Sequence, residues 1–369
     1  MSESEEATQR LMDGSSWDQF CDTLKAAGKV IQAETAPSDP LSRAEGYRYL
    51  SRLTRAALEA FVENNDPKAP MLIRPVHETA KIGADNPDNY YQYTCVSGEF
   101  DYRIWGNRGT VARLSFGSQA GNYGSTGGSA PTGSLNADEL EIDKDGNFEI
   151  IVSSKEHPGN WLPMAPDSEA LFVRQTFLDR ENEVVADLQI ERLADDKSAG
   201  LLTPEMMAQG LTSTGNLVLG ISTLFATWAE DFKKEKNLLP HFDTSKAALA
   251  GGDPSITYYH GYFELTPDEA LVIDVTPPDC DYWNFQLNNY WMESLDYRFF
   301  PIVINKHSAV LGEDGSVRVV VSSRNPGVDN WLDTAGHNFG TMCWRWVCAE
   351  EFPEPKTRVM KISELEAGG

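Results

Sequence analysis

The sequence predicts a mainly β protein with helical additions, in which two β-sandwich or jelly-roll-like domains are joined by helices. Three observations predict this class. Two distant stretches repeat one pattern, DGNFEIIVSSKEHPGNWL from Asp145 and DGSVRVVVSSRNPGVDNWL from Asp314. Short β-prone runs divided by Gly, Asn, Asp and Pro surround both copies. Helical periodicity is confined to the N-terminal region and to a segment in the middle of the chain.

At 369 residues the chain is longer than one hydrophobic core usually supports, and we divide it into four parts. Residues 1–66 form an acidic tail followed by helices, and residues 67–195 form a first β-domain. Residues 196–250 form a helical connector, and residues 251–369 form a second β-domain. The first stretch, up to about residue 14, is poor in apolar side chains, so we expect it to be disordered.

Helices are expected in the first and third parts. In the first part, Trp17 and Phe20 begin an apolar stripe, and a second helix starts with Asp39 as N-cap and Pro40 at its first position. Thr203 caps the connector helix in the same way. The N-terminal helices carry no chemistry of their own, so their expected role is to pack against a sheet or a partner subunit. A homo-oligomer therefore stays an open alternative.

Strands of an antiparallel sheet are expected throughout the first β-domain. A glycine-rich stretch, Gly117–Gly133, interrupts them and predicts a loop, either a lid over a site or a plain connection. The expected strands are Tyr90–Val96, Asp101–Trp105, Thr110–Phe116, Phe148–Ser153, Ala170–Phe177 and Val184–Ile190.

The repeat predicts two related β-domains. In both copies an Asp-Gly pair suits the positive backbone angles of a tight turn. Each copy ends in Asn-Trp-Leu, which we expect to anchor a loop by burying the indole. Two related halves create a cleft between them, and clefts at domain interfaces are common ligand sites.

The stretch Asp281–Phe300 interleaves aromatic and amide side chains more densely than any other. Between Tyr282 and Tyr290 the residues alternate with the period of a strand, so one face buries Trp283 and Phe285 while the other presents a ladder of hydrogen-bonding groups. This ladder lines a ligand pocket, or else it lies on a solvated or inter-domain face and satisfies neighbouring backbone groups.

Two segments of the second domain carry a family resemblance. Tyr282–Trp291 and the run NKHSAVLGEDGSVRVVVSSRNPGVDNWLDTAGHNFGTMCWRW, from Asn305 to Trp346, resemble the bacterial domain-of-unknown-function family 1214. The segment Asn86–Thr110 is similar to the N-terminal portion of longer members. The resemblance implies a β-sandwich or jelly-roll C-terminal domain. Because such proteins occur in bacteria that degrade aromatic or steroid-like compounds, it also implies a hydrophobic, ring-bearing substrate.

The composition excludes several classes of protein. A formal net charge of -25 would repel nucleic acid and an anionic membrane, so neither is an expected partner. The polar, acidic N-terminus carries no secretory signal. The five scattered cysteines fit free thiols in a reducing cytoplasm, where we expect the protein to be located.

No organic cofactor is expected. The chain has neither a dinucleotide-binding glycine fingerprint nor a phosphate-binding loop. Its six histidines show none of the close spacings that metal ligands use. A divalent metal held by several strands stays the alternative, because cupin-like barrels collect their ligands in that way.

Two histidines are candidate catalytic proton carriers. His260 lies near the first strand of the second domain, where Glu264 is close enough in sequence to orient it. His337 follows Gly336 after the Asn-Trp-Leu loop, and loops deliver functional groups from a rigid scaffold. For His260 the alternative is a structural role among the tyrosines around it.

Four arginines are candidates for binding negative charge, because a guanidinium offers a planar fork of donors. Arg298, in DYRFF, and Arg345, in WRW, are placed in the catalytic set, where each would stabilise developing negative charge. An ion pair with a nearby acid is the alternative. Arg103 and Arg108, in YRIWGNRG, form a small basic group that we place on the same cleft.

We therefore expect an enzyme of bacterial catabolism that acts on an aromatic or polycyclic small molecule by acid/base chemistry. It would be a lyase or hydrolase, in the sharpest version a lyase that releases a small aldehyde. The rival is a non-catalytic tandem β-sandwich that binds a carbohydrate or another ligand on aromatic platforms. The remaining residues of the expected substrate site are Tyr259, Trp283, Asn284, Gln286, Asn288, Tyr290, Trp291 and Asn330.

Overall fold

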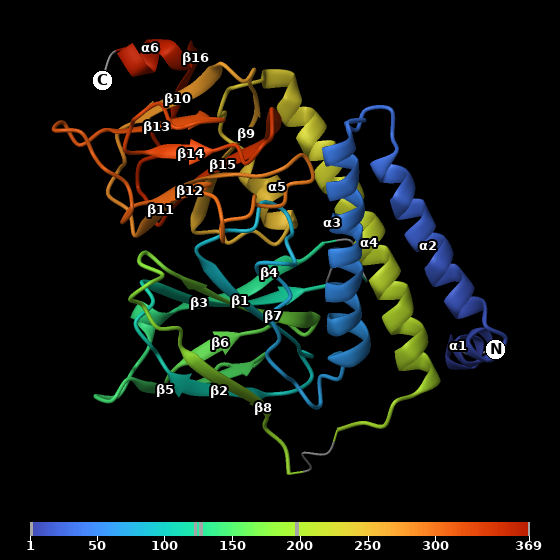
Figure 1. Ribbon diagram of the computed structural model, residues 1–369. Coiled ribbons are helices and arrows are strands. Elements are labelled where there is room, and N and C mark those ends of the chain that lie inside the picture. The colour runs from blue at the N-terminus through green and yellow to red at the C-terminus, as the bar shows by residue number, and fades with distance from the viewer. Residues whose placement is uncertain (1–2, 122–123, 125–127, 196–198, 368–369) are drawn as a thin grey trace.

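The computed structural model describes residues 3–121, 124, 128–195 and 199–367. Two β-rich halves lie one above the other, and long helices run along one side of both (Figure 1). The predicted class, mainly β with two β-domains and helices, is confirmed. Within these residues no helix is long and apolar enough to cross a membrane.

The first half is a sandwich of two four-stranded sheets, with strand orders β1-β7-β3-β4 and β6-β5-β2-β8. Its pairings are antiparallel, except that β5 and β6 run parallel. The strands are β1 (Asn89–Cys95), β2 (Tyr102–Asn107), β3 (Arg113–Ala120), β4 (Ala130–Asn136), β5 (Asn147–Ser153), β6 (Trp161–Pro163), β7 (Ser168–Thr176) and β8 (Asp187–Arg192). Each expected strand is present, with its ends displaced by a few residues.

The second half repeats this arrangement, with strand orders β9-β15-β11-β12 and β14-β13-β10-β16. Again one pairing, β13 with β14, is parallel. The strands are β9 (Ile256–Glu264), β10 (Glu269–Val275), β11 (Tyr282–Leu287), β12 (Val303–Asn305), β13 (Val317–Ser322), β14 (Trp331–Asp333), β15 (Phe339–Val347) and β16 (Lys356–Lys361). The two halves thus share one strand order, as the repeat predicts.

Each half has its own core between its two sheets. In the first half, Ile104 of one sheet and Val173 of the other belong to one buried cluster. In the second half, Trp283, Phe285 and Trp344 pack against the strands of the facing sheet. The predicted alternation of the segment from Tyr282 is confirmed, because Trp283, Phe285 and Leu287 all lie in this core.

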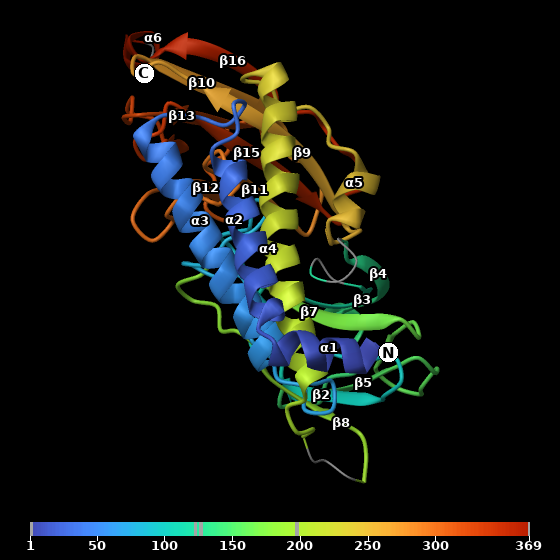
Figure 2. The same cartoon turned by 90° about the vertical axis from the view of Figure 1, so that its right-hand side faces the viewer.

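The helices form a layer that spans both halves. Figure 2 shows α2, α3 and α4 standing side by side, with α1 lying across their lower end. Asp39 and Thr203 cap α3 and α4 as predicted, accepting from the amides of Ser42 and Met206. The helices are α1 (Glu3–Met12), α2 (Ser15–Ile31), α3 (Pro40–Leu58), α4 (Pro204–Phe232), α5 (Thr244–Leu249) and α6 (Ile362–Ala367). The shorter turns are η1 (Glu59–Glu63), η2 (Ala137–Glu139) and η3 (Lys233–Glu235).

The expected disorder of the N-terminus is wrong for residues 3–12, which form α1. Although its composition is polar, the helix lies against α4, where Ala7 is buried and Ser4 and Thr8 donate to the carboxylate of Glu205. A tertiary contact therefore orders a segment whose own sequence favours solvent.

The glycine-rich stretch Gly117–Gly133 is not a loop at either end, because it contains the last residues of β3 and the first residues of β4. The small residues there permit close packing. A Cβ on Gly133 would lie 2.1 Å from the carbonyl oxygen of Pro163. The lid interpretation rests on the tip of this hairpin, and residues 122–123 and 125–127 lie outside the described part of the chain.

The repeat is preserved down to individual hydrogen bonds. The Asn160 amide donates to two backbone carbonyls at 2.9 Å, and Asn330 donates to two carbonyls at 2.7 and 3.0 Å. Trp161 and Trp331 each donate an indole N–H to the strand that precedes them. Both indoles are only half-buried, and the leucine that follows each one fills the core instead.

Candidate functional site

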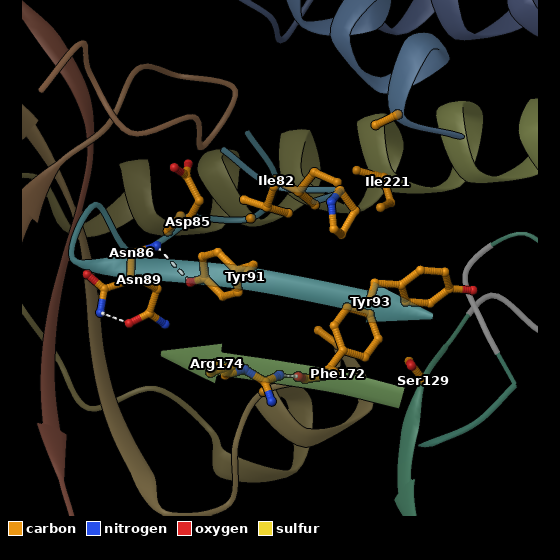
Figure 3. A pocket seen from close by; sticks show the side chains of 18 of the residues that line it. Ile82, Asp85, Asn86, Asn89, Tyr91, Tyr93, Ser129, Phe172, Arg174 and Ile221 are labelled. Carbon is orange, nitrogen blue, oxygen red and sulfur yellow. Dashed lines mark hydrogen bonds between the residues drawn. The ribbon is translucent and has the colours of Figure 1, made fainter. Parts of the chain in front are cut away.

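A cavity of 220 Å³ lies between the two halves, beneath the helical layer. The first half supplies wall residues from β1, β3 and β7, and the second half supplies residues from β9 and β15. Figure 3 shows β1 and β7 beneath the cavity and the helices beyond it. The sequence predicted a cleft between two related β-domains, and this cavity is in that place.

The roof of the cavity is apolar. Ala57 of α3, Ala60 and Phe61 of the π turn that follows it, and Leu217 and Ile221 of α4 line this side. A π turn of this kind is frequent at functional sites because it redirects side chains within a helix.

The opposite wall is polar and carries one tyrosine–arginine pair from each half. Tyr91 on β1 stands directly across from Arg174 on β7. Tyr258 on β9 stands directly across from Arg345 on β15. All four side chains line the cavity. Each half therefore presents the same two functional groups on neighbouring strands.

Strand alternation explains why these side chains point into the cavity. Val173 lies in the core of the first half, so its neighbour Arg174 projects from the opposite face of the sheet. Trp344 and Trp346 lie in the core of the second half, so Arg345 between them projects away from that core. The sheet β1-β7-β3-β4 of the first half and the sheet β9-β15-β11-β12 of the second half thus face each other across the cavity. We call them the inner sheets, and each turns toward the cavity the face that points away from its own core.

The two pairs occupy corresponding positions in the two sheets. In the first half the cross-strand row runs from Asn136 through Ser115 and Arg174 to Tyr91. In the second half it runs as Asn305, Asn284, Arg345 and Tyr258. Asn305 follows Asn136 by the same number of residues as Asp314 follows Asp145 in the repeat. The tyrosine–arginine pair is therefore part of the duplicated architecture.

Arg345 is buried and fixed by neutral acceptors. Its Nη1 donates to Asn284 Oδ1 at 3.1 Å and to Gln286 Oε1 at 2.6 Å, and its Nη2 donates to the carbonyl of Ala84. Among the described residues no carboxylate lies within ion-pair distance of it, in contrast to the ion pair considered from sequence. Because these acceptors are neutral, the positive charge of the buried guanidinium is available to interact with a ligand in the cavity.

The amide ladder of β11 holds the segment that forms one end of the cavity. Gln286 donates to the carbonyl of Asp85 at 2.8 Å, and Asn284 donates to Asn86 Oδ1 at 2.9 Å. Tyr282 donates to a carboxylate oxygen of Asp88 at 2.6 Å. Of the two interpretations of this ladder, the contacts match the inter-domain one, since it positions Asp85 and Asn86 as cavity residues without lining the cavity itself.

Several donors at the polar wall remain available. Arg174 donates through Nη2 to the carbonyl of Gly251 at 2.8 Å, and its other N–H groups have no partner in the described part of the chain. The same is true of the Tyr258 hydroxyl. The Tyr91 oxygen accepts from the backbone N–H of Asn86 at 3.0 Å (Figure 3), and its own hydrogen has no acceptor among the described residues. The polar wall therefore carries several hydrogen-bond donors that face the cavity.

Burial shifts the ionisation of the groups around the cavity. It raises the pKa of Tyr91 and of Tyr258, while Arg345 beside both phenols opposes the shift. It also raises the pKa of Asp85, opposed by Lys81 and by hydrogen bonds from Ser294. Both phenols are consequently neutral near pH 7 and act as hydrogen-bond donors.

The comparisons with known proteins place the chain in a family. A family model described as protein of unknown function, DUF1214, matches residues 126–178, which contain the first copy of the repeat. A crystal structure of a putative uncharacterized protein from Burkholderia cenocepacia is 53% identical, covers 97% of this chain and 99% of that chain, and has a TM-score of 0.95. The chain belongs to the DUF1214 family. The resemblance predicted from sequence is thus confirmed, although the model matches in the first half and the sequence pointed chiefly to the second.

A more distant solved structure is that of a protein from Vibrio parahaemolyticus. It is 11% identical, covers 91% of this chain and 100% of that chain, and has a TM-score of 0.49. This similarity is too low to support a conclusion about this chain. No curated protein matches the chain. The site of this DUF1214 protein must therefore be interpreted from its own residues.

The two predicted histidines lie outside the cavity. The His260 ring is stacked between Phe232 at 5.2 Å and Tyr258 at 5.8 Å, and burial lowers its pKa to about 3. Glu264 does not orient it, because that carboxylate pairs with a lysine at the surface. His337 donates through Nε2 to a carboxylate oxygen of Glu45 in α3 at 3.0 Å. That contact joins the second half to the helical layer.

The predicted aromatic platform is structural in its contacts. Tyr259 donates to the carbonyl of Phe352, and Trp283 stacks on Trp344 in the core of the second half. Tyr290 donates to Glu230 of α4 at 2.9 Å, and Trp291 donates to the carbonyl of Ser42 in α3 at 2.9 Å. The contacts of Tyr290 and Trp291 hold α4 and α3 against the second half.

Of the other predicted residues, only Arg345 lines the cavity. Arg298 pairs with Asp296 at the surface, and Arg103 pairs with two glutamates on the outer sheet of the first half. Arg108 is half-buried in the turn after β2, and burial lowers its pKa. Asn330 holds the Asn-Trp-Leu loop, as described above, and Asn288 accepts from Gln286 at 2.6 Å. No group of metal-ligating side chains is found in the part of the chain that the structure describes.

Three residues of the polar wall, Tyr91, Arg174 and Tyr258, were not among those predicted from the sequence. A usable signal was present, because an arginine stands inside an apolar strand in each half, in LFVRQTF and in MCWRWV. An arginine at such a position must face a polar partner or a cavity. Comparing the two strands as parts of the repeat would have identified both arginines together.

Proposed function

We propose that this protein binds a small, ring-bearing organic anion in the cavity between its two halves. One observation carries the proposal: a tyrosine–arginine pair from each half, Tyr91 with Arg174 and Tyr258 with Arg345, lines the same cavity opposite an apolar roof. A ligand with an apolar ring and an anionic oxygen group complements both sides of this cavity.

The volume supports a single ring. A cavity of about 150 Å³ lined by apolar side chains accepts benzene, and the cavity here measures 220 Å³. A benzene ring with a short acidic side chain fits that space. A four-ring steroid skeleton is too large for it, so the polycyclic part of the substrate class expected from sequence is not proposed.

The electrostatics support an anion. Arg345 is buried without a carboxylate within ion-pair distance among the described residues, and Arg174 makes one bond there, to Gly251. In a partly buried site of lowered dielectric constant, two guanidiniums attract a carboxylate or phenolate more strongly than they would in water. The apolar roof disfavours the rival carbohydrate ligand, since sugar hydroxyls facing Ala60 or Ile221 would lose their hydrogen bonds.

A second candidate function is turnover of this ligand by acid/base chemistry, as the sequence led us to expect. The observation that favours it is the Tyr258 hydroxyl, which faces the cavity beside Arg345 without a hydrogen-bond partner among the described residues. A neutral phenol in that position would donate a proton to an oxygen of the substrate while the guanidiniums stabilise the developing charge. A lyase that releases a small aldehyde is the version to test first.

Calorimetric titration of the purified chain with benzoate, phenylacetate and the matching neutral amides tests binding. We expect the acids to bind and the amides to bind at least about tenfold more weakly, because the amides carry no charge for the arginines. Arg174→Gln should remove most of this preference, and Arg298→Gln, at the surface, should leave it unchanged. Equal binding of acids and amides would refute the proposal.

Mass spectrometry of ring acids and phenols incubated with the protein, with and without a chelator, tests turnover. Loss of a substrate mass together with a product of defined mass difference would establish an enzyme, and Tyr258→Phe should abolish the reaction. Binding without any change of mass would leave the protein as a binding module.

A further inference from the structure

The cavity is built as two equivalent half-sites. One half-site is Tyr91 with Arg174, and the other is Tyr258 with Arg345. The two half-sites occupy equivalent cross-strand positions in the inner sheets of the two halves. The two pairs line one cavity and lie close enough that the charge of each guanidinium acts on both phenols. A ligand at this wall therefore meets both half-sites at once.

The donors at the wall outnumber the acceptors of a simple carboxylate. Within the described part of the chain, Arg174 makes only its bond to Gly251, and the Nε–H of Arg345 and both phenol hydrogens have no acceptor. A carboxylate that fills one half-site bidentately would leave the other half-site without an acceptor. Donors left unpaired in an enclosed site oppose binding.

We infer that the ligand carries two oxygen functions on neighbouring carbon atoms, a carboxylate and an adjacent carbonyl or hydroxyl oxygen, so that each tyrosine–arginine pair binds one of them. This inference rests on the proposed function, since it specifies the chemistry of the anion bound in the same cavity. A ring acid with a 2-oxo or 2-hydroxy group is the class that fits.

The apolar roof explains why the two oxygens are neighbours. Ala57, Ala60, Phe61 and Ile221 occupy the side of the cavity opposite the tyrosine–arginine pairs. An oxygen at the far end of the ring would lie against these side chains without a hydrogen-bond partner. We therefore place both oxygen functions at the end of the ligand that faces the arginines.

Three ligands with the same ring and the same carboxylate test the inference. Phenylacetate has no second oxygen, phenylglyoxylate has a carbonyl next to the carboxylate, and 4-hydroxyphenylacetate has its second oxygen at the far end. In calorimetric titrations of the full chain we expect phenylglyoxylate to bind about tenfold or more tightly than phenylacetate. We expect 4-hydroxyphenylacetate to bind no more tightly than phenylacetate.

Variants assign the effect to the half-sites. Tyr258→Phe and Tyr91→Phe each keep the ring and lose one donor, so either should reduce the advantage of phenylglyoxylate over phenylacetate. Tyr90→Phe is the matched control, because Tyr90 is adjacent in β1 but points to the other face, toward the core of the first half. It should leave that advantage unchanged.

The possible results separate the two proposals. Equal affinity of phenylacetate and phenylglyoxylate would overturn the inference and leave the proposed function standing. Retention of the full advantage in both cavity tyrosine variants would also overturn it. Failure of all three acids to bind would overturn the proposed function, and the inference with it.

Discussion

Replacing Arg345 with methionine should destabilise the protein strongly, because its guanidinium is the common partner of three buried acceptors. These are the side-chain oxygens of Asn284 and Gln286 and the carbonyl of Ala84. Both amides are fully buried, so water cannot replace the lost donors. Each unpaired buried acceptor costs about 1 to 3 kcal/mol. Partial relief comes from rotation of the amides and from removal of a buried charge, so we expect a net loss of about 3 to 5 kcal/mol in the free energy of unfolding.

Tryptophan fluorescence during urea unfolding measures this loss, since Trp344 and Trp346 flank Arg345 in β15. Arg298→Met is the matched control. That arginine is exposed and pairs only with Asp296, so its loss should change the free energy of unfolding by less than about 0.5 kcal/mol. A loss below about 1 kcal/mol for Arg345→Met would show that the buried acceptors are not held by the guanidinium, and the reasoning would fail.

Three further predictions concern stability. Burial alone would lower the pKa of His337, but the hydrogen bond and charge of Glu45 raise it. The pair therefore stabilises the fold fully below the ordinary histidine pKa, about 6.5. This stabilisation is lost as the pH rises through the raised pKa. Unfolding midpoints between pH 5.5 and 8.5 should fall more steeply for the native protein than for Glu45→Gln. Gly261→Ala should cost about 1 to 3 kcal/mol, because its Cβ would lie 2.1 Å from a carbonyl oxygen of the facing loop. Asn160→Ala and Asn330→Ala should each cost about 1 to 3 kcal/mol, since both amides make the same two backbone contacts.

Each of these has a contradicting result. A pH dependence that survives in Glu45→Gln would assign it to other groups. A Gly261→Ala variant as stable as the native protein would mean that the loop facing β9 is free to move. Strongly unequal effects of the two asparagine variants would show that the repeat is conserved in shape but not in energetics.

The fold was largely predictable because its strongest signals are local. Asp39 with Pro40 and Thr203 with Pro204 mark helix starts through side-chain caps that need no tertiary information. Strand alternation identified the core face of β11. The internal repeat predicted two halves of one architecture, and the shared strand order agrees with that prediction.

The errors arose where tertiary contacts overrule local composition. The polar helix α1 is ordered by α4, a partner almost two hundred residues away along the chain. The glycines near Gly133 predict a loop by composition, whereas they permit a close approach to Pro163 within a sheet. Neither contact can be inferred from the residues next to it.

The candidate site was predictable only in part. The cleft between the halves follows from the repeat. The direction in which Arg345 points, away from the core, follows from strand parity. Tyr91, Arg174 and Tyr258 required the cross-strand register, which the sequence does not state. The dense aromatic stretch attracted attention instead, although most of its side chains hold the helices and the segment from Asp85 in place.

The cavity is lined by residues from Ala56 to Arg345, so it exists only when nearly the whole chain is folded and both halves have docked. A small molecule that binds there couples the two halves thermodynamically. At a hundredfold excess over its dissociation constant it would add about 2.7 kcal/mol to the stability of the assembled state. Partial unfolding of either half would release it. A ligand bound at the proposed site would therefore stabilise the whole assembled molecule rather than one half of it.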